Sequence, residues 1–175
     1  MQSKMRGYLH IYTGNGKGKS TAAFGLALRA AGSGMRVYIA QFVKGRTYSE
    51  ITAVRQQLPQ ITIRQFGRGC FIVEKPTDED VAAAREGLAV VSEVLISGEY
   101  DLVILDEATI AIYYDLFTVS ELIDLLTRRA PGCEVVVTGR YAPEELIELA
   151  DLVTEMREVK HYYRQGIEAR EEIEY

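Results

Sequence analysis

The sequence predicts an α/β fold with a mostly parallel sheet that helices cover on both faces. Strand-like and helix-like segments alternate along the chain, which is the pattern of such folds. Several strand-like segments are apolar at every position, as expected for strands buried on both faces. Hydrophobic residues make up 47% of the 175 residues, enough for one ordinary core. We therefore expect residues 1–175 to form a single domain with a C-terminal tail from about residue 157.

The first part of the chain contains three predicted strands and one helix. Residues 8–12 form an apolar strand, and residues 19–31 form an alanine-rich helix that glycines end. Residues 37–42 are nearly all apolar and predict a buried strand, whereas residues 61–66 alternate and predict a weaker one.

The rest of the chain continues the alternation, with clear start and stop signals for its helices. Pro76 and Thr77 precede acidic residues at a helix start, Gly98 stops that helix, and Thr118 opens a capping box with Glu121. The predicted elements are a helix between Thr77 and Gly98, a strand over 102–105, a helix from Thr118 to about residue 129, a strand over 134–138, a helix beginning at Pro143 and a strand over 152–156.

The loops that follow the strands are expected to meet at one edge of the sheet, because ligands of such sheets bind at the carboxyl ends of the strands. These loops cover residues 13–20, 41–49, 106–114 and 138–142. Residues 43–60 and 66–77 show no regular pattern, and irregular segments of this length are often functional.

Residues 13–21 read Thr-Gly-Asn-Gly-Lys-Gly-Lys-Ser-Thr and lie between the first predicted strand and helix. This is the context of a phosphate-binding P-loop, so the fold is predicted to be of the P-loop NTPase (RecA-like) kind. Glycines let backbone N–H groups point into one concavity, and the following helix adds its positive end. Lys19 would neutralise phosphate charge, and the Ser20 hydroxyl would ligate magnesium.

The loop departs from the usual spacing, which places a glycine where this chain has Thr13. The first glycine comes one residue later, and Lys17 adds a second cation. The alternative interpretation is a glycine- and lysine-rich surface turn without a ligand. The residues predicted to bind the nucleotide are Gly14, Asn15, Gly16, Lys17, Gly18, Lys19, Ser20 and Thr21.

The apolar residues 102–105 are followed by Asp106 and Glu107. A carboxylate at the end of a buried strand beside a P-loop can hold magnesium, so both are candidate metal ligands together with Ser20. Many buried strands also end in a surface charge. Successive residues of an extended segment point in opposite directions, which implies that only one carboxylate faces the site, and the sequence leaves open which one. Arg140, at another strand end, is predicted to meet phosphate.

Several segments in order resemble the P-loop type of ATP:corrinoid adenosyltransferases, from about residue 7 to the end of the chain. The matching segments are residues 13–21, 41–45, 101–107, 138–140 and 155–161, with the closing residues 166–175. The resemblance implies transfer of the 5′-deoxyadenosyl group of ATP to the cobalt of a reduced corrinoid, cob(I)alamin or a precursor, with release of tripolyphosphate. Such a reaction belongs to cobalamin biosynthesis or salvage.

The resemblance also implies roles for particular residues and partners. Cobalt(I) is the nucleophile, so the protein positions the substrates and stabilises the leaving polyphosphate. Lys19 and Glu107 are the residues expected to be catalytic, and Mg²⁺ or Mn²⁺ is expected with ATP. A homodimer and an electron-donating flavoprotein are the expected protein partners.

In this family, aromatic residues displace the lower cobalt ligand. Better-known members carry a Phe-Thr-Trp sequence, whereas the matching residues 69–74 of this chain contain Phe71 and the chain has no tryptophan. Phe71, offset by one position, is the candidate for the corrinoid pocket, and a core aromatic is the alternative. Lys44 is a candidate contact to phosphate or to a corrinoid side chain, or a solvated loop residue. The tyrosine pairs 113–114 and 162–163 suit a corrin face or a dimer contact equally.

Composition narrows the classes of function. The net charge of −5 argues against sequence-independent nucleic-acid binding, which needs a basic face. Two cysteines, distant in sequence, suggest a reducing compartment, with Cys133 as a buried apolar residue. We expect a cytoplasmic protein with no membrane segment. The alternative functions are a P-loop kinase or ATPase performing phosphoryl transfer, and a non-enzymatic ATP-dependent switch or corrinoid carrier.

Overall fold

A computed structural model describes residues 6–46, 48–69, 72, 75–170 and 173. Its strands form one parallel sheet in the order β3-β2-β4-β5-β1-β6. The strands are β1 (Leu9–Thr13), β2 (Val37–Phe42), β3 (Ile61–Phe66), β4 (Leu102–Asp106), β5 (Glu134–Thr138) and β6 (Leu152–Glu155). The helices are α1 (Lys19–Gly32), α2 (Ser49–Gln57), α3 (Asp78–Ser97), α4 (Ala108–Tyr113), α5 (Val119–Thr127), α6 (Glu144–Leu149) and the 3₁₀ helix η1 (Tyr162–Gln165).

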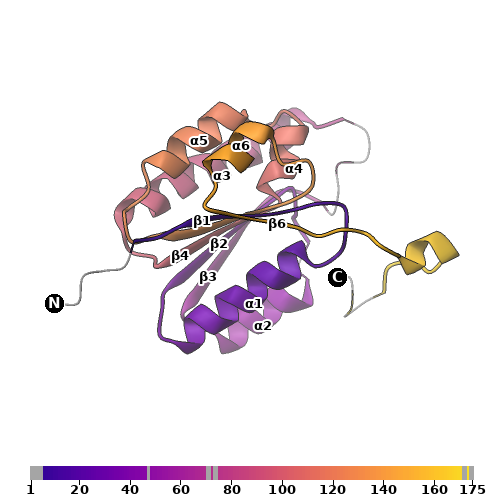
Figure 1. The fold of residues 1–175 in the computed structure, drawn as a ribbon, viewed down its shortest axis with the longest axis horizontal. Helices are drawn as coiled ribbons and strands as arrows, with labels where there is room; N and C mark the ends of the chain where they lie inside the picture. Colours follow the sequence, from indigo (N-terminus) through magenta and orange to yellow (C-terminus); the bar gives the residue numbers. More distant parts are fainter. Residues whose placement is uncertain (1–5, 47, 70–71, 73–74, 171–172, 174–175) are drawn as a thin grey trace.

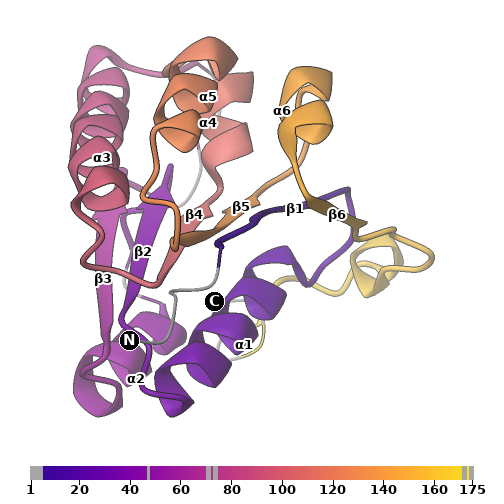
Figure 2. The same cartoon turned by 60° about the vertical axis from the view of Figure 1, so that its left-hand side comes forward.

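Helices cover both faces of the sheet, as the apolar strands predict. Helices α1 and α2 lie on one face, and α3, α4, α5 and α6 lie on the other (Figures 1 and 2). Each face of the sheet has its own hydrophobic core, and successive residues of β2 contribute to different cores. Ile39 packs with the helices of the first face, and Tyr38 packs with those of the second. The predicted α/β class and parallel sheet are therefore confirmed. The prediction succeeds because strands buried on both faces need apolar residues at nearly every position.

The start and stop signals read from the sequence are found at the predicted helix ends. The Thr77 side chain accepts a hydrogen bond from the Asp80 backbone N–H, and Thr118 accepts one from Glu121, so both helices begin with a capping box. Gly98 ends α3 in the left-handed conformation, with φ of 67°. These three local signals are confirmed.

Two helices lie in segments that the sequence predicted to be irregular. Helix α2 falls within residues 43–60 and buries only Ile51 and Val54, so its apolar stripe is too short to give a periodic signal. Helix α4 falls within the predicted loop 106–114. It has six residues, and no side chain caps its start at Glu107. The prediction of irregular structure was wrong for both segments.

Cys133 is buried directly before β5, as predicted for a small apolar residue, whereas Cys70 lies outside the described residues. Among the helices of the described ranges, none is long and apolar enough to cross a membrane. After β6 the chain passes the loop between β1 and α1, and η1 lies beyond the β6 edge of the sheet (Figure 1).

Candidate active site

The loop between β1 and α1 encloses the side chain of Lys19. Its Nζ atom donates hydrogen bonds to the carbonyl oxygens of Gly14, at 2.8 Å, and Gly16, at 2.7 Å. Burial lowers the pKa of Lys19 by more than the nearby Glu107 carboxylate raises it. Helix α1 begins after Gly18 without a side-chain cap, so its first N–H groups are available for an anion.

The glycines of this loop are also required by the segment that follows β6. Strand β1 extends through Thr13, which pairs with Glu155, so the loop itself starts at Gly14. A Cβ atom at Gly14 would lie 2.5 Å from the Met156 carbonyl oxygen, and one at Gly16 would lie 2.7 Å from the same atom. The position of the first glycine, Gly14 instead of residue 13, therefore has a structural reason. The backbone of the loop packs directly against the backbone of the segment after β6.

Replacing Gly16 with alanine is expected to lower the free energy of unfolding by about 1–3 kcal/mol, as overpacking does. The added Cβ would meet the backbone of Met156 and Arg157, which cannot move without disturbing the loop. Urea unfolding measures the effect. Gly25→Ala in α1 is the matched control, because a Cβ atom there meets nothing within 4 Å. Its free energy of unfolding is expected to rise by about 0.5–1 kcal/mol, because alanine loses less backbone entropy than glycine in a helix. Equal midpoints for Gly16→Ala and the unmodified protein would contradict the packing described.

Asp106, at the end of β4, is fully buried and accepts hydrogen bonds on both oxygens. Ser20 Oγ and Thr138 Oγ1 each donate to Oδ1 at 2.7 Å, while Gln41 Nε2 and Lys44 Nζ each lie 3.0 Å from Oδ2. Burial alone would raise the pKa of this carboxyl, but the Lys44 charge and these hydrogen bonds hold it below its usual value. Asp106 is therefore a charged carboxylate held in one orientation.

Glu107 lies close to the same cluster, although its backbone is not extended. Its φ of 59° is left-handed, and its Oε1 atom lies 4.0 Å from Lys44 Nζ. Burial and the neighbouring Asp106 charge raise the pKa of Glu107. Because the residue leaves the strand conformation, alternation along a strand does not separate the two carboxylates. Which of the two carboxylates holds the metal stays a prediction.

Gln41 and Thr138 are site residues that the sequence prediction missed. Gln41 is the last residue but one of β2 and Thr138 is the last residue of β5, the strands on either side of β4, and both hydrogen-bond to Asp106. Both are completely buried. The signal that could have found them is a polar residue at the carboxyl end of an otherwise apolar strand.

The cluster offers the ligands that hard divalent cations prefer. The Ser20 hydroxyl and the Asp106 carboxylate are oxygen donors that already touch, and the Glu107 carboxylate is close by. Lys44 Nζ lies among them, 3.4 Å from Ser20 Oγ. Of the two interpretations of Lys44 from the sequence, the structure therefore favours a residue of this cluster over a solvated loop residue. These residues fit a magnesium or manganese ion bound together with phosphate oxygens.

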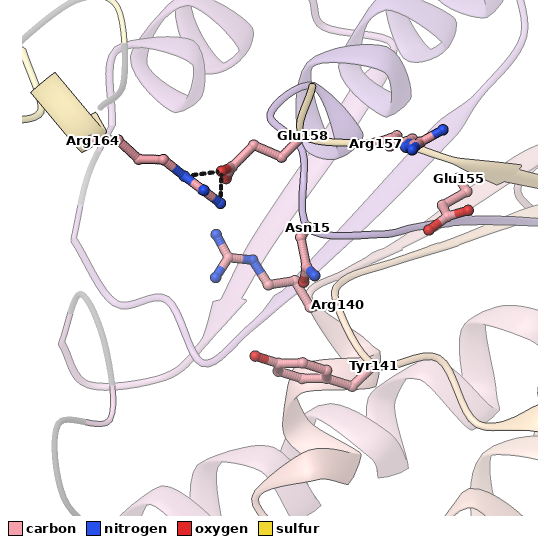
Figure 3. A pocket seen from close by; sticks show the side chains of 7 residues that line it. All are labelled: Asn15, Arg140, Tyr141, Glu155, Arg157, Glu158 and Arg164. Atoms are coloured by element: carbon pink, nitrogen blue, oxygen red, sulfur yellow. Dashed lines mark hydrogen bonds and ion pairs between the residues drawn. The ribbon is translucent and has the colours of Figure 1, made fainter. Parts of the chain in front are cut away.

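Two neighbouring pockets share Arg140 and Tyr141, and the second of them is also lined by Lys44 and Glu107 of this cluster. The first, of about 410 Å³, is mostly polar (Figure 3). It is lined by Asn15, Arg140, Tyr141, Glu155, Arg157, Glu158 and Arg164. The second, of about 310 Å³, is mostly apolar and aromatic. It is lined by Val43, Lys44, Ile72, Glu107, Ile110, Tyr113, Tyr114, Arg140 and Tyr141. Arg140 thus lies at the border of the two pockets.

The other residues predicted to belong to the site lie outside the cluster around Asp106. Lys17 is exposed, and its Nζ atom contacts the Ile173 carbonyl oxygen of the tail at 3.0 Å. Asn15 and Thr21 are exposed on the loop and on α1. Phe71, the candidate for the corrinoid pocket, lies outside the described residues.

Comparison with known proteins finds a close likeness over nearly the whole chain. The model of the family described as ATP:corrinoid adenosyltransferase BtuR/CobO/CobP matches residues 5–175. A corrinoid adenosyltransferase of Pseudomonas aeruginosa is 36% identical over 171 residues, covering 97% of this chain and 84% of the relative. One of Escherichia coli is 36% identical over 170 residues, covering 97% and 86%, and one of a Sinorhizobium species is 38% identical over 176 residues, covering 97% and 81%.

Proposed function

The chain belongs to the ATP:corrinoid adenosyltransferase family, and we propose that it transfers the 5′-deoxyadenosyl group of ATP to the cobalt of a reduced corrinoid. The observation that carries this proposal is the arrangement of the site. A phosphate loop that encloses Lys19 lies next to the Asp106 cluster, and an apolar pocket lined by tyrosines opens beside that cluster. Such a site can hold a triphosphate beside a substrate that presents an apolar ring face.

The proposed reaction requires no nucleophilic side chain from the protein. The electron pair of cobalt(I) attacks C5′ of ATP, a cobalt–carbon bond forms, and the C5′–oxygen bond breaks. The triphosphate leaves with the electrons of that bond as tripolyphosphate. The protein's contribution is to align the two substrates and to stabilise the charge that develops on the leaving oxygen. We expect Lys19 and the N–H groups at the start of α1, where no side chain caps the helix, to do this.

Ser20 and Asp106 would hold Mg²⁺, or Mn²⁺, with Glu107 near enough to contact it directly or through water. A divalent cation would supply further charge neutralisation of the triphosphate. Lys44 and Arg140 add two cations at the same edge of the sheet, so the described part of the site is strongly complementary to polyphosphate.

We place the corrinoid in the second pocket, because its lining combines apolar side chains with tyrosines beside Lys44 and Glu107. Ile72, the residue after Phe71, is part of this lining, and the Tyr114 hydroxyl donates to the Ile72 carbonyl oxygen at 3.2 Å. Phe71 lies outside the described residues, and its role as a corrinoid contact stays a prediction.

Anaerobic incubation with ATP, Mg²⁺ and chemically reduced cob(I)alamin tests the proposed function. We expect a corrinoid whose mass, measured by mass spectrometry, has increased by one 5′-deoxyadenosyl group. A carrier would bind the corrinoid and return it unmodified, which would contradict the proposal. Omitting ATP is the control for non-enzymatic alkylation.

The proposal extends to the setting of the enzyme. We expect a homodimer in the cytoplasm, with an electron-donating flavoprotein as the source of the reduced corrinoid. Analytical ultracentrifugation tests the dimer, and replacing the chemical reductant with a reduced flavoprotein tests the electron donor.

A further inference from the structure

The ammonium group of Lys44 lies among the same oxygen atoms that fit a divalent cation. Its Nζ atom is 3.0 Å from Asp106 Oδ2 and 3.4 Å from Ser20 Oγ. Glu107 Oε1 lies 4.0 Å away. Ammonium groups and divalent cations are both attracted to carboxylate oxygens, so Lys44 already brings positive charge to the place where a metal ion would bring it.

The surroundings of Lys44 keep this ammonium group charged and in place. Its side chain is only 15% exposed. Burial alone would lower the pKa of Lys44, but the Asp106 and Glu107 carboxylates raise it above its usual value. The Nζ atom also lies 5.7 Å from the centroid of the Tyr48 ring, within the range of a cation–π contact. Lys44 therefore balances the charge of Asp106 by itself.

The backbone on either side of Lys44 is held in place by its neighbours. Val43 has a φ of 63°, in the left-handed region, where a β-branched residue is a clear outlier. A Cβ atom at Gly45 would lie 2.5 Å from the Gly67 carbonyl oxygen, and the Gly45 N–H donates to the Gly69 carbonyl oxygen at 2.6 Å. Strained residues persist where the surrounding structure imposes the strain, and they gather at functional sites. This strained and clamped backbone fixes the point from which the Lys44 side chain reaches Asp106.

The side chain of Lys44, unlike its backbone, can change direction. A lysine carries its compact ammonium group on a flexible stem of four carbons. A divalent cation and an ammonium group on the same buried oxygens would repel each other strongly. Binding of a metal ion by Asp106 and Ser20 therefore requires the ammonium to move away. Phosphate oxygens on the neighbouring loop would attract it, and the second pocket, which Lys44 also lines, offers it room.

We propose that Lys44 holds the cation position in the nucleotide-free protein and leaves it when a divalent cation enters together with the triphosphate. Lys44 is then a positioning residue that orients Asp106 and opposes the binding of a metal ion alone. The metal binds well only when phosphate oxygens give the ammonium a new partner. The inference rests on the proposed function for the identity of the nucleotide.

The first test measures Mn²⁺ binding to the nucleotide-free protein by electron paramagnetic resonance, which detects the free ion. Lys44→Met keeps nearly the length of the side chain and removes its charge, so we expect it to bind Mn²⁺ about tenfold or more tightly. Lys44→Gln is the second variant, because its amide can still donate to Asp106 if Lys44→Met does not fold. Mn²⁺ is also expected to raise the melting temperature of these variants more than that of the unmodified protein.

Arg46→Met is the matched control, because Arg46 is an exposed cation two residues from Lys44. Its charge is screened by solvent, so Arg46→Met is expected to bind Mn²⁺ as the unmodified protein does.

The second test uses titration calorimetry with the complex of Mn²⁺ and inorganic tripolyphosphate. Once the ammonium has moved to the phosphates, its removal no longer favours the metal, so neither Lys44 variant is expected to bind this complex more tightly. Unchanged or weaker binding of Mn²⁺ alone by the folded Lys44 variants would overturn the proposal. An equal gain with and without tripolyphosphate would also overturn it, because the ammonium would then not leave. Since no adenosyl transfer is measured, a failure of the proposed reaction would be seen separately.

Discussion

Lys19→Ala is expected to lower the turnover number for adenosyl transfer by about 100-fold or more, the loss seen when one group that stabilises developing negative charge is removed. In the structure the Lys19 ammonium is enclosed by the loop and bonded to two of its carbonyl oxygens. Little water can replace it there, so the charge of the leaving triphosphate would go unbalanced. Steady-state kinetics with saturating ATP and reduced corrinoid measure the effect, and calorimetry shows whether ATP still binds.

Arg55→Ala is the control for the loss of one positive charge, since Arg55 lies in α2 and is exposed, away from the phosphate loop. Its turnover is expected to match that of the unmodified protein. Circular dichroism would show whether Lys19→Ala is folded. A folded Lys19→Ala protein with nearly normal turnover would remove the loop from the mechanism.

Asp106→Asn is expected to have the second largest effect and to act on both stability and metal dependence. Asp106 Oδ2 receives hydrogen bonds from Lys44 and Gln41, whereas an amide nitrogen at that position would face two donors. Leaving the largely buried Lys44 without its charge partner costs about 3–5 kcal/mol. We expect a lower melting temperature and a large rise in the Mg²⁺ concentration that gives half-maximal activity.

Glu107→Gln is the matched comparison, because it also converts a carboxylate into an amide without changing its size. Glu107 is farther from Lys44 and accepts no hydrogen bond from Ser20 among the contacts described, so a smaller rise in the Mg²⁺ requirement is expected. If Glu107→Gln raises that requirement more than Asp106→Asn does, then Glu107 is the principal ligand and the assignment made here is reversed.

The features that could be predicted from the sequence are those encoded locally. The apolar runs of β2 and β4 indicate burial on both faces, and Thr118 with Glu121 indicates the start of α5. The phosphate loop is equally local, since its glycines and lysines are consecutive. The helices α2 and α4 are short and bury few residues, so their signal does not rise above that of an irregular segment.

The remaining features depend on how distant segments meet. Gln41 and Thr138 surround Asp106 only because β4 lies between β2 and β5, an order that no local pattern encodes. The left-handed backbones of Glu107 and Tyr141 are imposed by tertiary contacts, against the preference of those residue types. The packing of Met156 against Gly16 likewise needs β6 to lie beside β1.

The central claim is that the phosphate loop holds the triphosphate of ATP as an intact leaving group. Phosphorus-31 NMR of the phosphate products, after turnover with ATP and cob(I)alamin, tests it most directly. We expect tripolyphosphate as the product, in an amount equal to the adenosylated corrinoid. ADP and inorganic phosphate as the only products from ATP would show attack at phosphorus, and the triphosphate would then not be an intact leaving group.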